Sequence, residues 1–181
     1  MRKRRIWVIY PIIPVIILLY ICALRYYPPT EEKAGTWLEK HRKDVDIVAN
    51  YLKGLEYDDA FFHKSWNDDN TAVWYEFEWH YVPSEEVRKS VRRLWRAGCL
   101  SIDKNDDTNA NTIYFMIFSR TIGGVDCGIA CTIDGHGTPK TQCQIRHEQI
   151  DNGWFYVYNG YEEWRRNPSQ YEENQPWNPP Y

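Results

Sequence analysis

The sequence predicts an α+β fold: an N-terminal transmembrane helix followed by an antiparallel sheet of about five strands packed with two helices. Three observations predict it. Residues 6–24 carry no charge, two later segments repeat apolar residues every three or four positions, and much of the second half alternates apolar and polar residues. The 181 residues, 43% hydrophobic and 26% charged, suffice for one globular domain with short appendages.

The N-terminal segment is basic and then strongly apolar. Basic residues occupy positions 2–5, and residues 6–24 would span about 28 Å as a helix, close to the hydrocarbon thickness of a bilayer. Because positive charge stays on the cytoplasmic side, we expect a single-pass protein of the cell membrane, with its N-terminus cytoplasmic and its C-terminal domain outside. The alternative is a secreted protein after signal cleavage, although Ile21 is large where a small residue is preferred before a cleavage site.

Changes in composition divide the chain into four parts. Residues 1–25 are the basic start and anchor, residues 26–35 a linker, residues 36–166 the outer α+β domain, and residues 167–181 a tail rich in Pro and Asn. All 25 acidic residues follow residue 25, whereas five of the 22 basic residues precede residue 26. The outer part is therefore net acidic, which argues against a nucleic-acid partner.

Two segments of the outer domain have helical periodicity. Residues 36–55 place apolar side chains on one face, and Gly54 marks the end of the pattern. The second helix is predicted to start at Ser84, which can cap free backbone N–H groups, and to end at Gly98. This helix carries a basic stripe of Arg88, Arg92 and Arg96, with Lys89 and Arg93 beside it. The stripe has two interpretations: a solvated face paired with carboxylates, which an acidic domain favours, or a binding face for anionic lipid headgroups or a cell-wall polyanion.

Five segments alternate with the period of a strand: 71–82, 113–121, 125–134, 141–150 and 154–158. Short Gly-containing turns separate the last four, so we expect a meander in which consecutive strands are neighbours. A hairpin centred on Gly137 would then place Cys131 and Cys143 opposite each other, within reach of a disulfide bond. The alternative is that the cysteines after the anchor are small buried hydrophobic residues.

The first of these strands carries the candidate ligand-binding residues. Trp74, Glu76, Glu78 and His80 share one face of it, opposite an apolar face that would join the core. Aromatic and polar groups on one surface suit ligand or partner recognition, although a strand packed on one side and wet on the other has the same pattern. Glu78 and His80 alone cannot enclose a metal ion, so we expect no metal site and no cofactor.

Sequence signatures of catalysis are absent: there is no GxSxG elbow, HExxH helix or phosphate-binding GxxxxGK[ST] loop. We therefore assign no catalytic residue and expect a membrane-anchored, extracytoplasmic, non-catalytic binding or interaction domain. Its expected partners are the membrane, through the N-terminal helix, and another envelope protein or a ligand. The alternative is a membrane-anchored envelope hydrolase that uses Glu76, Glu78 and His80, or Asp134 and His136, as acid/base groups.

Overall fold

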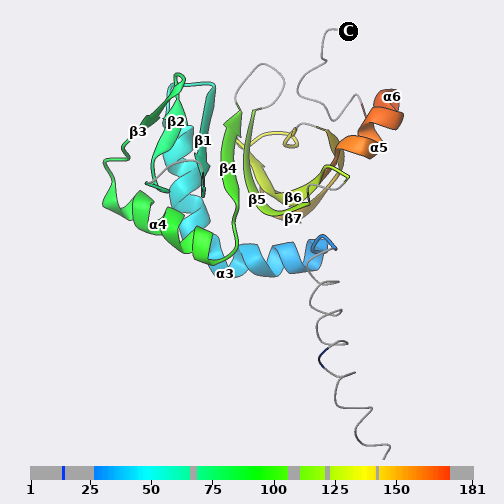
Figure 1. Cartoon of the computed structure of the whole chain (residues 1–181), viewed down its shortest axis with the longest axis horizontal. Helices are drawn as coiled ribbons and strands as arrows, with labels where there is room; N and C mark the ends of the chain where they lie inside the picture. The colour runs from blue at the N-terminus through cyan, green and yellow to red at the C-terminus, as the bar shows by residue number, and fades with distance from the viewer. Residues whose placement is uncertain are drawn as a thin grey trace, which may run out of the picture.

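The structure, a computed structural model, describes Pro14 and residues 27–65, 69–105, 111–120, 123–141 and 143–171. In chain order its elements are α3 (Glu31–Lys53), β1 (Asp59–His63), β2 (Val73–Tyr75), β3 (Glu78–His80), α4 (Glu85–Arg96), β4 (Ser101–Asn105), β5 (Thr112–Arg120), β6 (Val125–Thr132), β7 (Gln144–Asp151), β8 (Trp154–Gly160), α5 (Tyr161–Arg166) and α6 (Pro168–Tyr171). The strands form one curled antiparallel sheet of order β3-β2-β1-β4-β5-β6-β8-β7 (Figure 1).

The predicted fold class is wrong in two respects. The sheet has eight strands rather than about five, because β1 and β4 are too short to show a clear alternation and one predicted strand is a hairpin. Within the described ranges, no helix is long and apolar enough to cross a membrane. The transmembrane helix predicted over residues 6–24 falls, apart from Pro14, on residues outside those ranges.

Helices α3 and α4 follow from local signals in the sequence. Thr30 caps α3 by accepting a hydrogen bond from the Lys33 N–H at 3.5 Å, and Ser84 caps α4 through the Val87 N–H at 3.3 Å. Each helix presents one apolar face to the sheet. The buried side chains of these faces include Leu38, Val45, Val48 and Leu52 on α3, and Val87, Val91, Leu94 and Trp95 on α4.

The two faces of the sheet have different surroundings. Directly paired residues on neighbouring strands project from the same face. One row of such pairs is buried beneath α3 and α4: Phe62, Ile102, Phe115, Ile129 and Tyr156. The other row is Trp79, Trp74, Phe61, Asp103, Tyr114, Ala130 and Phe155. We call the face that carries this second row the open face, because α3 and α4 pack against the opposite side.

The predicted meander is wrong at the end of the chain. Strand β8 lies between β6 and β7, because the long connection from Thr132 to Gln144 carries β7 past it, whereas a tight turn at Gly153 (φ 72°) joins β7 to β8. Cys131 is consequently paired with Ile113 and Trp154, and no disulfide bond links it to Cys143. The disulfide prediction fails because β6 and β7 are not neighbours.

The predicted strand at 71–82 is also wrong, since it folds back on itself. Glu76 and Phe77 have φ angles of 50° and 67° and form a two-residue turn, so that Trp74 pairs with Trp79. Positive φ at both turn residues is the geometry of a type I′ hairpin, which normally selects Asn-Gly. Residues at 75 and 78 thereby share a face, and the alternation seen in the sequence changes sides at the turn.

Replacing Glu76-Phe77 by Asn-Gly is expected to stabilise the protein by about 1 kcal/mol. A residue with a Cβ is disfavoured by about that much in the left-handed conformation, which Gly adopts freely and Asn tolerates. The thermal midpoint should rise by about 3 °C in a calorimetric scan. Phe77→Ala, which removes the ring but keeps the strained Cβ, is the control and should give no increase. An Asn-Gly variant that melts below the wild type would contradict this account of the turn.

Candidate functional site

The open face holds a cavity of ≈ 620 Å³ over β4, β5 and β6. Its floor comes from strand residues, including Asp103, Tyr114 and Asp126, and its wall from Thr141, Asn159 and Tyr161. Strand pairing explains why these groups converge. Asp103 is the direct partner of Tyr114, and Asp126 is the direct partner of Asn159, so all four project from the open face.

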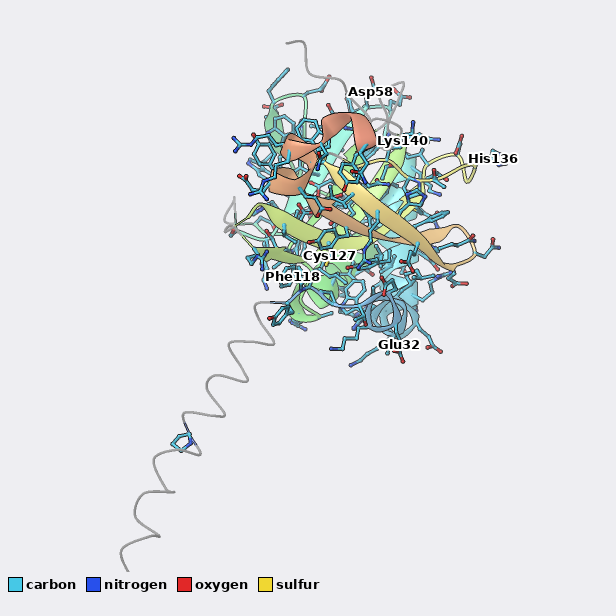
Figure 2. All side chains as sticks on the ribbon, turned by 90° about the vertical axis from the view of Figure 1, so that its right-hand side faces the viewer. Glu32, Asp58, Phe118, Cys127, His136 and Lys140 are labelled. Atoms are coloured by element: carbon cyan, nitrogen blue, oxygen red, sulfur yellow. The ribbon has the colours of Figure 1, made fainter. Side chains whose placement is uncertain are left out.

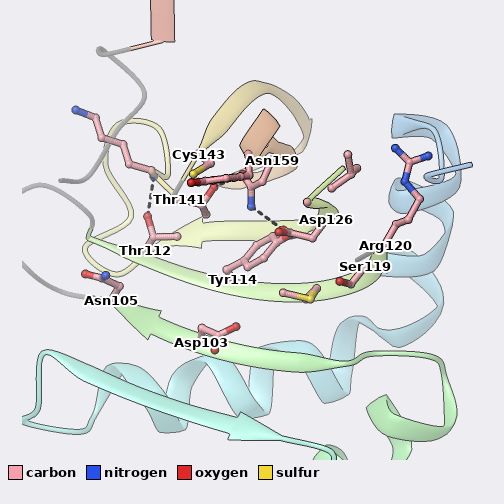
Figure 3. A pocket seen from close by; sticks show the side chains of 15 residues that line it. Asp103, Asn105, Thr112, Tyr114, Ser119, Arg120, Asp126, Thr141, Cys143 and Asn159 are labelled. Atoms are coloured by element: carbon pink, nitrogen blue, oxygen red, sulfur yellow. Dashed lines mark hydrogen bonds between the residues drawn. The ribbon is translucent and has the colours of Figure 1, made fainter. Parts of the chain in front are cut away.

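A chain of hydrogen bonds fixes Asp126 within the cavity. The Tyr114 hydroxyl and the Asn159 side-chain amide both donate to Oδ1 of Asp126, each at 2.7 Å (Figure 3). The Thr141 hydroxyl in turn donates to Oδ1 of Asn159 at 2.6 Å, which orients the amide. Among the described residues, no hydrogen bond engages Oδ2 of Asp126. The network therefore holds the carboxyl group in place and leaves one of its oxygens for a ligand.

The second carboxyl group of the cavity belongs to Asp103. Its Oδ2 accepts a hydrogen bond from the Ser101 hydroxyl at 2.7 Å. Although Asp103 keeps some solvent contact through the cavity, loss of hydration raises its pKa to about 7, and the negative charge of Asp126 adds to the effect. Burial also raises the pKa of Asp126, against the opposing effect of the hydrogen bonds from Tyr114 and Asn159. Two carboxyl groups that both resist ionisation in one cavity create a place for a cation or a proton.

Positive charge lies in the lining of the same cavity. Lys140 and Arg120 contribute to its wall, and both are half-buried. The backbone N–H of Lys140 donates to the Thr112 hydroxyl at 2.8 Å, which fastens the segment before β7 over the start of β5 (Figure 3). The cavity thus offers groups of both signs to a bound molecule.

The structure does not bring the predicted site residues together. Trp74 is on the open face, where it stacks on Phe61 at 4.8 Å between ring centroids, but it does not line the cavity. Glu76 is exposed in the turn. Glu78 and His80 are on the opposite face, with 3.7 Å between Glu78 Oε1 and His80 Nε2.

The contacts of His80 and His136 stabilise the local structure. The His80 ring stacks on Tyr75 at 3.7 Å, and its Nε2 is 3.2 Å from the Tyr75 carbonyl oxygen. The carboxylate of Asp134 accepts a hydrogen bond from the backbone N–H of His136 at 2.8 Å, which shapes the exposed turn. Figure 2 shows His136 at the outer end of this loop. Neither Glu78 and His80 nor Asp134 and His136 are among the residues that line the cavity of the open face.

Sequence reasoning missed Asp103, Asp126 and Asn159. A signal was present: Asp126 is the one charged residue of the otherwise apolar or small strand β6, and a charge kept in such a strand normally has a specific partner. In the described part of the chain, no three His, Cys, Asp or Glu side chains converge as metal ligands would.

Comparison with known proteins identifies no relative. No protein-family model matches the chain, and no curated protein or solved structure is significantly similar to it. The function is therefore inferred from the chemistry of the cavity.

Proposed function

We propose that this domain binds a small molecule bearing an ammonium group in the cavity of the open face, with Asp103 and Asp126 as its counter-charges. The observation that carries the proposal is the pair of carboxyl groups in one cavity, both with raised pKa values. A bound cation would stabilise the charged form of both groups and lower their pKa values. A cationic ligand would therefore replace the proton that Asp103 binds below its raised pKa.

The arrangement is suited to binding because it is already in place before a ligand arrives. Tyr114 and Asn159 hold Oδ1 of Asp126, so little side-chain freedom is lost on binding. Lys140 lines the same cavity and supplies a positive charge. We therefore expect a zwitterion such as an α-amino acid to bind more tightly than a simple amine of the same size.

This proposal is a specific form of the predicted non-catalytic binding domain. The location of the domain outside the cytoplasm and its partners in the envelope stay predictions from the sequence. A reporter enzyme that is active only outside the cytoplasm, fused after residue 181, tests the location. Activity in whole cells is expected, and its absence would contradict the predicted orientation.

Asp126→Asn is expected to weaken the binding of a cationic probe at least tenfold, because the amide carries no counter-charge. The probes are ethanolamine, putrescine and L-alanine, titrated into the full chain and followed by amide chemical shifts of residues 101–105 and 123–132. Glu78→Gln removes a carboxylate outside the cavity and should leave affinity unchanged. Affinity should also rise between pH 6 and pH 8, as Asp103 loses its proton.

Two results would overturn the proposed ligand class. The first is a set of probes that shifts none of the cavity resonances at millimolar concentration. The second is binding that Asp126→Asn leaves intact, which would place the ligand elsewhere on the domain.

An acid–base enzyme is the second candidate, and the environment of Asp103 favours it. A carboxyl group with a pKa of about 7 exists in both protonation states at neutral pH, as a general acid or base must. If the cavity is catalytic, Asp103→Asn should retain ligand binding and lose turnover.

The hydrolase predicted from the sequence is tested separately by His80→Ala and His136→Ala. Unchanged activity in both variants would eliminate those two groups as catalytic residues.

A further inference from the structure

A second hollow, of ≈ 680 Å³, lies between α3 and α4, on the opposite side of the sheet from the cavity. We call it the interhelical groove. Its lining includes Lys33, Trp37 and Lys40 from α3, together with Arg93 and Arg96 from α4. Because α3 and α4 are packed together, side chains two turns apart on α3 face the last turn of α4.

Hydrogen bonds fix the width of the interhelical groove at both of its ends. At one end the Trp37 indole N–H donates to the Ala97 carbonyl oxygen at 2.9 Å, so that α3 is tied to the C-cap of α4. At the other end Oδ1 of Asp44 accepts hydrogen bonds from the Ser90 hydroxyl at 2.8 Å and from Arg93 at 2.7 Å. These hydrogen bonds thus fix the positions of the two helices that carry the cationic side chains.

The positive charge of this groove is poorly compensated. Asp44 is the one carboxylate among the residues that line the groove, and its Oδ1 already accepts hydrogen bonds from Ser90 and Arg93. In the described ranges, no ion pair involves Lys33, Lys40 or Arg96. The other basic residues of the α4 stripe differ from Arg96, since Arg88, Lys89 and Arg92 all lie within 4 Å of Glu85, as expected for a solvated, paired face.

The position of Lys33 adds a further cost. It lies in the first turn of α3, at the positive end of the helix dipole, where a cation is unfavourable. Arg93 and Arg96 are in the last turn of α4, where the dipole favours them. The unpaired charges of Lys33, Lys40 and Arg96 are explained if an anion occupies the space between them.

We propose that the interhelical groove binds a phosphate group. Arginine guanidinium groups offer parallel donors to phosphate oxygens, and the lysines add charge without a fixed geometry. The indole of Trp37, with the His41 ring 5.0 Å away and tilted by 49°, gives the groove an aromatic wall for the organic part of a phosphorylated molecule. The phosphate group belongs either to a dissolved molecule or to the headgroup of an anionic phospholipid.

The test measures binding of inorganic pyrophosphate and of lipid vesicles to the full chain. Pyrophosphate is expected to raise the thermal midpoint more than sodium chloride of equal ionic strength, and to shift the amide resonances of residues 33–41 and 93–97. Lys40→Gln/Arg96→Gln should weaken this binding at least tenfold. Lys40→Arg/Arg96→Lys, which keeps both charges, should retain it, and Lys43→Gln, an exposed lysine outside the groove, should have no effect.

Vesicles distinguish the two sources of phosphate. Phosphatidylglycerol vesicles that bind the wild type more tightly than the glutamine double variant, with phosphatidylcholine vesicles as the reference, would assign the groove to a lipid headgroup. Pyrophosphate binding without this difference would assign it to a dissolved phosphorylated molecule. If neither probe distinguishes the wild type from a folded double variant, the proposal is wrong.

Discussion

Gly128→Ala is expected to destabilise the protein by about 4 kcal/mol or more, the largest effect of any change considered. Gly128 is in the middle of β6, between Met116 on β5 and Val157 on β8. A Cβ atom built at this position would be 2.0 Å from the Phe115 carbonyl oxygen and 2.9 Å from Cε2 of Tyr114. Because the first contact is with backbone, rotation of a side chain cannot relieve it, and two central strands would have to separate.

Urea denaturation measures this effect, and Gly35→Ala is the matched control. Gly35 lies inside α3, and a Cβ atom there would meet only Ile150, at 4.0 Å. Alanine has the higher helix propensity, so Gly35→Ala should stabilise the fold by about 0.5–1 kcal/mol. A Gly128→Ala variant within about 1 kcal/mol of the wild type would show that β5 and β6 are not packed as the structure has them.

Asp103→Asn is expected to stabilise the protein at pH 8 by about 2 kcal/mol and to leave its stability at pH 4 nearly unchanged. The folded state raises the pKa of Asp103 from 3.8 to about 7, so between these values the folded state binds more protons than the unfolded state. The contribution of Asp103 to stability is therefore highest below its pKa in the unfolded state and is lost as the pH rises through its pKa in the folded state. The full shift corresponds to about 4 kcal/mol, which we halve because Asp103 is partly solvated.

The asparagine variant tests this reasoning with little change in shape, since its amide oxygen can still accept the hydrogen bond from Ser101. Urea denaturation at pH 4, 6 and 8 should give a stability difference between the two proteins that grows with pH. Asp134→Asn is the control: its exposed carboxylate has a lowered pKa, so the variant should show no gain at pH 8. A difference that does not depend on pH would mean that Asp103 ionises normally in the fold.

The parts of the fold that the sequence predicts well depend on local patterns. The apolar faces of α3 and α4, the Ser84 cap of α4 and the alternation of the segments that form β5 to β8 are all visible within a few residues of sequence. The start of α3 is not among them, because the helix begins at Glu31, inside the segment predicted as a linker. The hairpin was missed because Glu76 and Phe77 are unusual turn residues and a period of two continues through them. After such a turn, residues that continue the same alternation project from the other face of the sheet. Glu78 and His80 are therefore on the face opposite Trp74.

The site could not be predicted because its residues come from different strands. Asp103, Asp126 and Asn159 meet only through the pairing of β4 with β5, of β5 with β6, and of β6 with β8. The meander predicted from the short turns would have placed β7 beside β6 and removed Asn159 from Asp126. A spacing rule can recognise groups on one helix or one strand, whereas this cavity requires the correct strand order.

The position of β8 between β6 and β7 also imposes an order on folding during synthesis. Strand β7 leaves the ribosome before β8, which is its one neighbour among the strands that the structure describes. The edge of β6 also stays unpaired until β8 has been made. The tight turn at Gly153 lets β7 and β8 pair quickly with each other and dock as a unit, and until then an unpaired edge is exposed to other nascent chains. A premature stop before residue 154 would therefore remove the strand that joins β7 to β6 and leave the edge of β6 exposed.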